Sequence, residues 1–429
     1  MLIAVFEDKL APNFHPLSLT RPVYALRCGP SLLYEKILKT FPSARIAFFM
    51  RNYLSKAFSA KIPRRQRPLS INDLNVLETE KDTLVLNGRW IFDSRLLHVG
   101  EEVIAVKDDS IVYAYLKRRT VSKFLEKSGS LLEFLEYVKS ELSPLRLNDA
   151  RLIAYPWDLI ESNSREINSE FEEFKRGKVK NLSKLDGVYH VGEKDRILIA
   201  ESAKIYPCVV LDSSEGPIII DEEAKIMPGS FIKGPCYIGK KTWIIGGKIE
   251  GSTIGPVCRV GGEVDESIIH GFSNKYHEGF LGHSYVGEWV NLGALSTTSD
   301  LKNNYTSVEV PIGGKLIDSG KLKIGAFIGD HTKTGIGSLF TTGAVVGVMC
   351  NLVTAGAPYP KYVPSFTWYV KGRASEGPGL EAMLKTARIA MDRRGVELTG
   401  DEMELFRKLY EMTRSERMAF IEKYSSKSK

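Results

Sequence analysis

The sequence is poor in cysteine and has no long apolar run. Its five cysteines are odd in number, widely spaced and without a C-x-x-C pair, which argues against a disulfide framework and a zinc knuckle. No apolar run approaches the roughly 20 residues that cross a bilayer. The start, MLIAVFEDKL, places acids directly after a short apolar run, unlike a signal peptide. We therefore expect a cytoplasmic protein without a membrane partner.

An excess of one charge is also nearly absent. The 59 basic and 52 acidic residues leave a net charge of +7, which fits anionic small molecules as well as it fits nucleic acid. The densest basic cluster, KIPRRQRP at 61–68, contains two prolines and no interleaved aromatic residue. A solvated loop is the first interpretation of this cluster, and a phosphate contact is the second. We expect small-molecule substrates and no nucleic-acid partner.

What the sequence does contain is a period of six. An α-helix needs apolar spacings of three and four and a strand needs two, whereas a six-residue repeat is typical of a parallel β-helix. One apolar residue on each face of such a coil points into a narrow column, which stacking buries. The period returns at 280, 286 and 292, and again at 340, 346 and 352. The first series consists of Ile220, Ile226, Ile232, Ile238 and Ile244.

The segments around this repeat predict two further domains. Short apolar strands at 2–6, 46–50, 84–86 and 103–106 alternate with helical stretches at 31–39 and 131–142, which indicates a Rossmann-like α/β domain with a largely parallel sheet. A helical segment at 155–174 closes it. After the β-helix, residues 375–395 begin a helical tail, and Thr399 and Glu402 form a capping box before its second helix. We expect domains at 1–178, 179–370 and 371–429, with a loop insertion at 297–322.

Two histidines stand in the same phase of the repeat. His277 lies three residues before the apolar Phe280, and His283 follows six residues after His277. Both are therefore expected to point outward at a corner of the coil, away from the apolar column. The simplest interpretation of these histidines is that they are two partly exposed polar side chains at turns.

Several motifs are similar to those of one enzyme family. RPV-x-x-LR-x-G, YPWDLI, YHEGFLGHSYVGEWVNLGA, SDLKNNY and GDHTKTGIG resemble the bifunctional family that combines glucosamine-1-phosphate N-acetyltransferase with UDP-N-acetylglucosamine diphosphorylase. The resemblance implies a nucleotidylyltransferase-like first domain and a left-handed β-helix. It also implies acetyl-CoA as co-substrate on the β-helix, Mg²⁺ for uridylyl transfer on the first domain, and a homotrimer with sites between neighbours.

The resemblance also implies roles for individual residues. His277 is the base that takes the amine proton, a task that suits an imidazole near neutral pH. Asn291 contacts the sugar, Phe280 stands where the family has a tyrosine, and Arg259 and Lys275 are the candidates for holding the sugar phosphate. The remaining expected residues are Asp300, Asp330 and Thr342 for coenzyme A, Arg21 and Lys36 for nucleotide phosphates, and Asp8 (or Glu7) for the metal.

Departures from the family pattern keep two other functions open. Lys9 and Ala11 replace phosphate-loop glycines, Asn87 matches the usual metal-binding aspartate, and Asp265 replaces a lysine. A non-catalytic relative that senses sugar nucleotides is therefore one alternative. The other is a zinc enzyme of the γ-carbonic-anhydrase type, which binds its metal with three histidines; the candidates for those ligands are His270, His277, His283 and His331.

Overall fold

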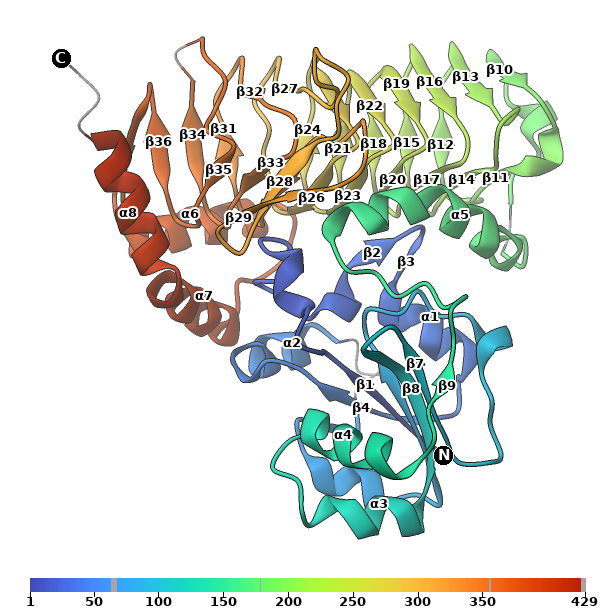
Figure 1. Ribbon diagram of the computed structural model, residues 1–429. Helices are drawn as coiled ribbons and strands as arrows, with labels where there is room; N and C mark the ends of the chain where they lie inside the picture. Colours follow the sequence, from blue (N-terminus) through green and yellow to red (C-terminus); the bar gives the residue numbers. More distant parts are fainter. Residues whose placement is uncertain (63–67, 178, 355, 426–429) are drawn as a thin grey trace. The chain divides into compact units, whose positions relative to one another are not determined.

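The computed structural model describes residues 1–62, 68–177, 179–354 and 356–425 (Figure 1). Packing divides the chain into two units. The first contains Met1–Phe14, Thr20–Leu26 and Ser31–Ala154, and the second contains His15–Leu19, Arg27–Pro30 and Tyr155–Lys429. The expected domain bounds at 178 and 370 stay predictions. The basic residues 63–67, on which a solvated loop was expected, lie outside the described residues.

The first unit is built around a seven-stranded sheet in the order β5-β4-β1-β6-β8-β7-β9. The predicted strands are present, and β1 pairs in parallel with β4 and β6. β8 runs antiparallel to both of its neighbours and was not expected. The strands are β1 Leu2–Phe6, β4 Arg45–Phe49, β5 Ser70–Ile71, β6 Asp82–Asn87, β7 Val103–Lys107, β8 Ser110–Lys117 and β9 Leu145–Arg146.

In the described part of this unit, four α-helices lie around the sheet (Figure 1). They are α1 Leu33–Thr40, α2 Ser55–Lys61, α3 Arg118–Leu125 and α4 Leu131–Glu141. One core cluster joins Val85 and Ala114 of the sheet to Phe134 of α4, all fully buried. The α/β interpretation of this part of the chain is therefore confirmed.

The second unit is a parallel β-helix, visible as the stacked coils of Figure 1. Each coil contributes strands to three faces, and each strand pairs in parallel with its equivalent in the next coil. The first face contains β10 Val188–Val191, β13 Val209–Asp212, β16 Ser230–Lys233, β19 Gly247–Glu250, β22 Glu263–Asp265, β25 Phe280–Gly282 and, farther along, β27 Thr297–Thr298 with β32 Leu339–Phe340.

The other two faces follow the same rule. The second face contains β11 Ile197–Ile199, β14 Ile218–Ile220, β17 Cys236–Ile238, β20 Thr253–Ile254, β23 Ile268–Gly271, β26 Tyr285–Glu288, β30 Ala326–Ile328, β33 Ala344–Val346 and β35 Tyr362–Val363. The third face contains β12 Lys204–Ile205, β15 Lys225–Ile226, β18 Trp243–Ile244, β21 Arg259–Val260, β24 Asn274–Lys275, β31 Lys333–Thr334, β34 Asn351–Val353 and β36 Trp368–Val370. It ends on β37 Arg373–Ser375, which departs from the rule because it pairs antiparallel with β36.

The isoleucines of the six-residue repeat form the interior of the coil. All five members of the first series are at most 1% exposed, in one continuous cluster. Ile220 pairs with Ile238 of the next coil, and Ile226 pairs with Ile244. Stacking thus buries a column of side chains that no single coil could shield from water. The predicted fold class, an α/β domain with a left-handed β-helix and C-terminal helices, is confirmed.

The expected insertion leaves the coil slightly later than its sequence suggested. Residues 297–298 still form β27 within the coil. The excursion then carries an antiparallel hairpin of β28, Glu309–Ile312, and β29, Lys315–Asp318. It closes where the Ile324 amide donates to the Asp300 carbonyl at 2.8 Å, so Asp300 marks the base of the excursion.

The α-helices of the second unit, within its described residues, are α5 Pro156–Phe174, α6 Leu380–Asp392, α7 Gly400–Met412 and α8 Arg414–Ser425. The capping box at the start of α7 is confirmed, because the Glu402 amide donates to Thr399 Oγ1 and the Thr399 amide donates to Glu402 Oε2. Phe420 of α8 packs on Tyr369, beside the last coil. Within the described residues, no helix is both long and apolar enough to cross a membrane.

Candidate functional site

His277 lies on the corner between the third and first faces, after β24 and before β25. Its side chain is exposed, and within the described part of the chain no hydrogen bond reaches its ring nitrogens. The Tyr276 ring contacts the imidazole edge-on, with 5.1 Å between centroids. The outward orientation expected from the repeat is thus observed, and the imidazole is available to a ligand.

Lys275 occupies an interior position of the same coil. It pairs with Val260 and stands in the column of Ile226 and Ile244, where the side chain is 3% exposed. Its Nζ donates to the carbonyls of Gly261 and Gly279 at 2.7 Å and to that of His277 at 3.3 Å. The ammonium group is therefore turned inward and fixes the turn that carries His277. Its expected phosphate-binding role stays a prediction that this geometry does not favour.

Burial lowers the pKa of Lys275 to about 8, which makes a pH-dependent prediction. The unfolded lysine titrates near its ordinary pKa of about 10.4, so between the two values the unfolded state binds more protons and stability rises with pH. We expect the wild type to gain about 3 kcal/mol over Lys275→Met between pH 8 and 10.5. Urea denaturation of both proteins at several pH values measures this difference. Parallel pH profiles of the two proteins would contradict it.

Two arginines without acidic partners lie beside this coil. Arg259 pairs in register with Asn274, and Arg394 Nη2 donates to Asn274 Oδ1 at 3.1 Å. Arg259 also lies over the Trp243 ring at 4.0 Å. Burial, followed by the charge of Arg394, lowers the pKa of Arg259 to about 10. Among the described residues neither guanidinium forms an ion pair with a carboxylate, so this place favours an anion.

Asn291 and Phe280 lie on either side of the His277 corner. Asn291 is exposed on the third face, where it bridges Asn274 and Lys333. Phe280 is half-buried in β25 of the first face. The structure thus brings these two expected residues and Arg259 onto the coils around His277, whereas Lys275 points away from them.

Gly282 is constrained by two of the expected residues. A Cβ built on it would lie 2.4 Å from Phe280 Cζ and 2.7 Å from Asp300 Oδ2. Gly282→Ala is therefore expected to lower the free energy of unfolding by about 1–3 kcal/mol, the usual effect of overpacking. Thermal unfolding beside Gly400→Ala, where a Cβ meets open space, provides the measurement. Equal stability of the two variants would contradict the packing argument.

The residues expected at coenzyme A do not share one place. Asp300 and Thr342 each follow the paired strands β27 and β32 by two residues, so they lie at the same corner of adjacent coils. Asp330 lies at a different corner, where its Oδ1 accepts the Glu288 amide at 2.8 Å. The coenzyme role of these three residues stays a prediction.

The four late histidines occupy different surroundings. His270 Nδ1 lies 2.9 Å from the Tyr285 hydroxyl. His331 stacks on Trp289 and contacts Phe406 edge-on. His283 Nδ1 bonds Asp300 Oδ2 at 2.8 Å, and His277 is exposed. Within the described residues, the histidines are therefore not gathered into the three-histidine cluster that the carbonic-anhydrase alternative needs.

The first unit contains a separate cavity of about 670 Å³ at the carboxyl ends of β1 and β4. Asp8, Lys9 and Arg51 line it, together with the start of α4. Arg21 and Lys36, the expected phosphate ligands, are each 7% exposed and do not line this cavity. Their nucleotide-binding role stays a prediction.

The carboxylates expected to hold Mg²⁺ in this cavity do not fit that role. Asp8 accepts Arg89 Nε at 2.7 Å and Nη2 at 2.5 Å, Asn87 Nδ2 at 2.9 Å and the Leu10 amide at 3.1 Å. Glu7 accepts two bonds from the Arg51 side chain, at 3.0 and 2.8 Å. A hard cation needs oxygen lone pairs that are free to coordinate it. Both carboxylates are instead committed to arginines, so this arrangement does not fit Mg²⁺.

Comparison with known proteins agrees with the motifs. Residues 3–179 match the family described as sugar nucleotidyl transferase. A bifunctional sugar-1-phosphate nucleotidylyltransferase/acetyltransferase of Sulfurisphaera tokodaii is 36% identical over 150 residues, which cover 32% of this chain and 35% of that protein. The bifunctional protein GlmU of Methanocaldococcus jannaschii is 26% identical over 266 residues, 60% of this chain and 56% of that protein.

A further relative, the bifunctional protein GlmU of Methanococcus maripaludis, is 29% identical over 195 residues, 46% of this chain and 41% of that protein. The alignments therefore span between about a third and somewhat over half of the length of these relatives. The resemblance to bifunctional nucleotidylyltransferase/acetyltransferases that the sequence motifs indicated is confirmed.

Proposed function

We propose that the β-helix transfers an acetyl group from acetyl-CoA to the amine of an amino-sugar-1-phosphate, with glucosamine-1-phosphate as the first candidate. The observation that carries the proposal is the pair Arg259 and Arg394, which flank Asn274 in the coil that presents His277. Two positive charges without a carboxylate partner suit a phosphate group. The names of the relatives, which include acetyltransferase, support the same chemistry.

The reaction needs a base beside this phosphate site. The amine nitrogen attacks the thioester carbonyl, the C–S bond breaks, and coenzyme A leaves as a thiol that takes up a proton. His277 has an exposed imidazole without hydrogen-bond partners among the described residues, so it can accept the amine proton and later release it. Arg259 and Arg394 would hold the phosphate, and Asn291 would contact the sugar from the third face.

The resemblance extends the proposal to the whole protein. It implies a homotrimer in the cytoplasm and a uridylyl transfer on the first unit. The description of the matched family and the names of the relatives support nucleotidyl transfer by this unit. Since Asp8 and Glu7 are paired with arginines, we place the acetyl transfer first and the nucleotidyl transfer second.

Free-thiol release from acetyl-CoA tests the proposed function. With glucosamine-1-phosphate the protein is expected to release coenzyme A, and with glucosamine, which lacks the phosphate, kcat/KM is expected to fall at least about tenfold, since hydrogen bonds to charged groups contribute about 1.5–3 kcal/mol. Absence of thiol release with every amino-sugar-1-phosphate would overturn the proposal and favour the sugar-nucleotide-sensing alternative.

A further inference from the structure

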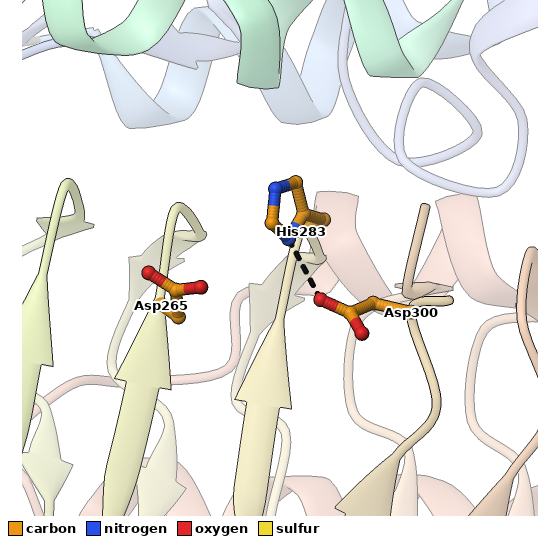
Figure 2. A group of neighbouring side chains, drawn as sticks. All are labelled: Asp265, His283 and Asp300. Carbon is orange, nitrogen blue, oxygen red and sulfur yellow. Dashed lines mark hydrogen bonds and ion pairs between the residues drawn. The ribbon is translucent and has the colours of Figure 1, made fainter. Parts of the chain in front are cut away.

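Three potential metal ligands from different coils meet at the corner between the first and second faces. Asp265 ends β22, His283 follows β25, and Asp300 follows β27 (Figure 2). One ligand atom from each of the three lies within 4.8 Å of the other two. This corner is at the other end of the short strand β25 from His277, so the cluster is distinct from the proposed base.

The imidazole of His283 lies between carboxylates. Its Nδ1 is 2.8 Å from Asp300 Oδ2, and its Nε2 is 3.5 Å from Glu266 Oε2. The side chains of His283 and Asp300 are each only 13% exposed.

None of the carboxylates at this corner forms an ion pair with a lysine or an arginine among the described residues, and His283 is the ion-pair partner of Asp300 and Glu266 there. The Asp265 carboxylate makes no hydrogen bond or ion pair among the described residues, although it lies half-buried beside His283. Lys323 acts on Asp300 through its charge without forming an ion pair in the described part of the chain. Three carboxylates thus surround one imidazole, which can carry at most one positive charge.

We propose that Asp265, His283 and Asp300 bind a divalent transition-metal cation such as Mn²⁺ or Zn²⁺. One imidazole with carboxylates is a ligand set for such ions rather than for Ca²⁺, which prefers oxygen alone. Adjacent ligands in an octahedral site are roughly 3 Å apart and opposite ligands roughly 4 Å. The 2.8 Å between His283 Nδ1 and Asp300 Oδ2 is close to the first value, and a ligand atom of Asp265 lies within 4.8 Å of a ligand atom of each of the other two residues.

Glu266 is positioned to hold the imidazole from outside the set of metal ligands. When Nδ1 binds the cation, the proton of the neutral ring moves to Nε2, which faces Glu266 Oε2. A metal-bound histidine usually donates its other N–H to a carboxylate, which holds the ring orientation. The bound cation would join three coils at the base of the excursion, where the Ile324 amide meets the Asp300 carbonyl, and should stabilise the fold.

Isothermal titration of the chelator-treated full chain with MnCl₂, and separately with ZnCl₂, tests the site. One cation per chain is expected, together with a rise in melting temperature. Asp265→Asn and His283→Asn are expected to weaken binding by more than about 10–100-fold, the usual effect of removing even a residue that only supports a metal ligand. Asp265→Asn is the more informative variant, because its carboxylate supports no other contact among the described residues and the folded structure should survive.

Two matched controls separate this site from general cation binding. Glu263→Gln removes an exposed carboxylate from the same strand as Asp265, and His190→Asn removes an exposed histidine from β10; both are expected to bind Mn²⁺ as the wild type does. The proposal is overturned by the absence of saturable binding, or by affinity that survives both site variants. Because the readout is binding, the outcome is independent of the acetyl-transfer assay.

Discussion

Replacing His277 with alanine is expected to lower kcat for coenzyme A release from acetyl-CoA at least about 100-fold, the lower range for loss of a general base. Without the imidazole, the neutral amine has no acceptor for the proton that it loses as it attacks the thioester. His277 is exposed and supports no side-chain hydrogen bond among the described residues, so the fold should be unchanged. Free-thiol release with glucosamine-1-phosphate measures the effect, and circular dichroism verifies the fold.

His190→Ala is the matched control for this variant. His190 is also exposed on the β-helix, in β10 of the first face, but it lies several coils away from Arg259. Its rate should equal that of the wild type. If His277→Ala retained the wild-type kcat, the base would have to be sought elsewhere, and the His283–Asp300 pair would be the next candidate.

Asp8→Asn is expected to destabilise the first unit by about 3–5 kcal/mol, because it leaves the positive charge of Arg89 buried without its anion. The Arg89 side chain is 1% exposed, and Asp8 is its carboxylate partner. Chemical denaturation of wild type and variant measures the difference. Asp93→Asn is the control, since its partner Arg95 is 79% exposed and such surface pairs contribute at most about 1 kcal/mol.

The same pair predicts an acid dependence. Burial raises the pKa of Asp8. The hydrogen bond and charge of Arg89, together with the bonds from Asn87 and Leu10, lower it by more, so the pKa lies below its ordinary value. A carboxylate whose pKa is lower in the folded protein stabilises the fold at any pH above its pKa in the unfolded chain, which is about 3.9. This stabilisation disappears as the pH falls through the pKa of the folded protein. The advantage of the wild type over Asp8→Asn should therefore shrink in acid. A stabilising effect of MgCl₂ that Asp8→Asn abolishes would show instead that this carboxylate binds the metal.

The repeat made the β-helix predictable, because the residue that points inward from each face has to be apolar wherever coils stack. Ile220 and Ile238 pair in neighbouring coils, and this pairing places both on the same face. The count of six does not reach Lys275, which lies 15 residues after Val260, its partner in the column. The sequence period therefore did not reveal that this lysine is interior, and the resemblance assigned it to the phosphate.

Other parts of the site depend on contacts that no local pattern encodes. Arg394 reaches Asn274 from beyond α6, so sequence separation hides it. His283 meets Asp300 only because the chain leaves the coil just after that aspartate. The antiparallel β8 was missed because SIVYAYLK carries the apolar pattern of any buried strand, and direction is set by its neighbours rather than by its residues.

Parallel stacking of the coils makes the length of the β-helix a quantity that evolution and engineering can vary. Each strand pairs only with its equivalents in the preceding and following coils, so deletion or duplication of one whole coil near β10 restores the same pairing on all three faces. The corner of His277 would meet an unchanged neighbour after such an event. The number of coils can therefore change while the corner of His277 stays the same, so homologous chains of different length can retain one reaction.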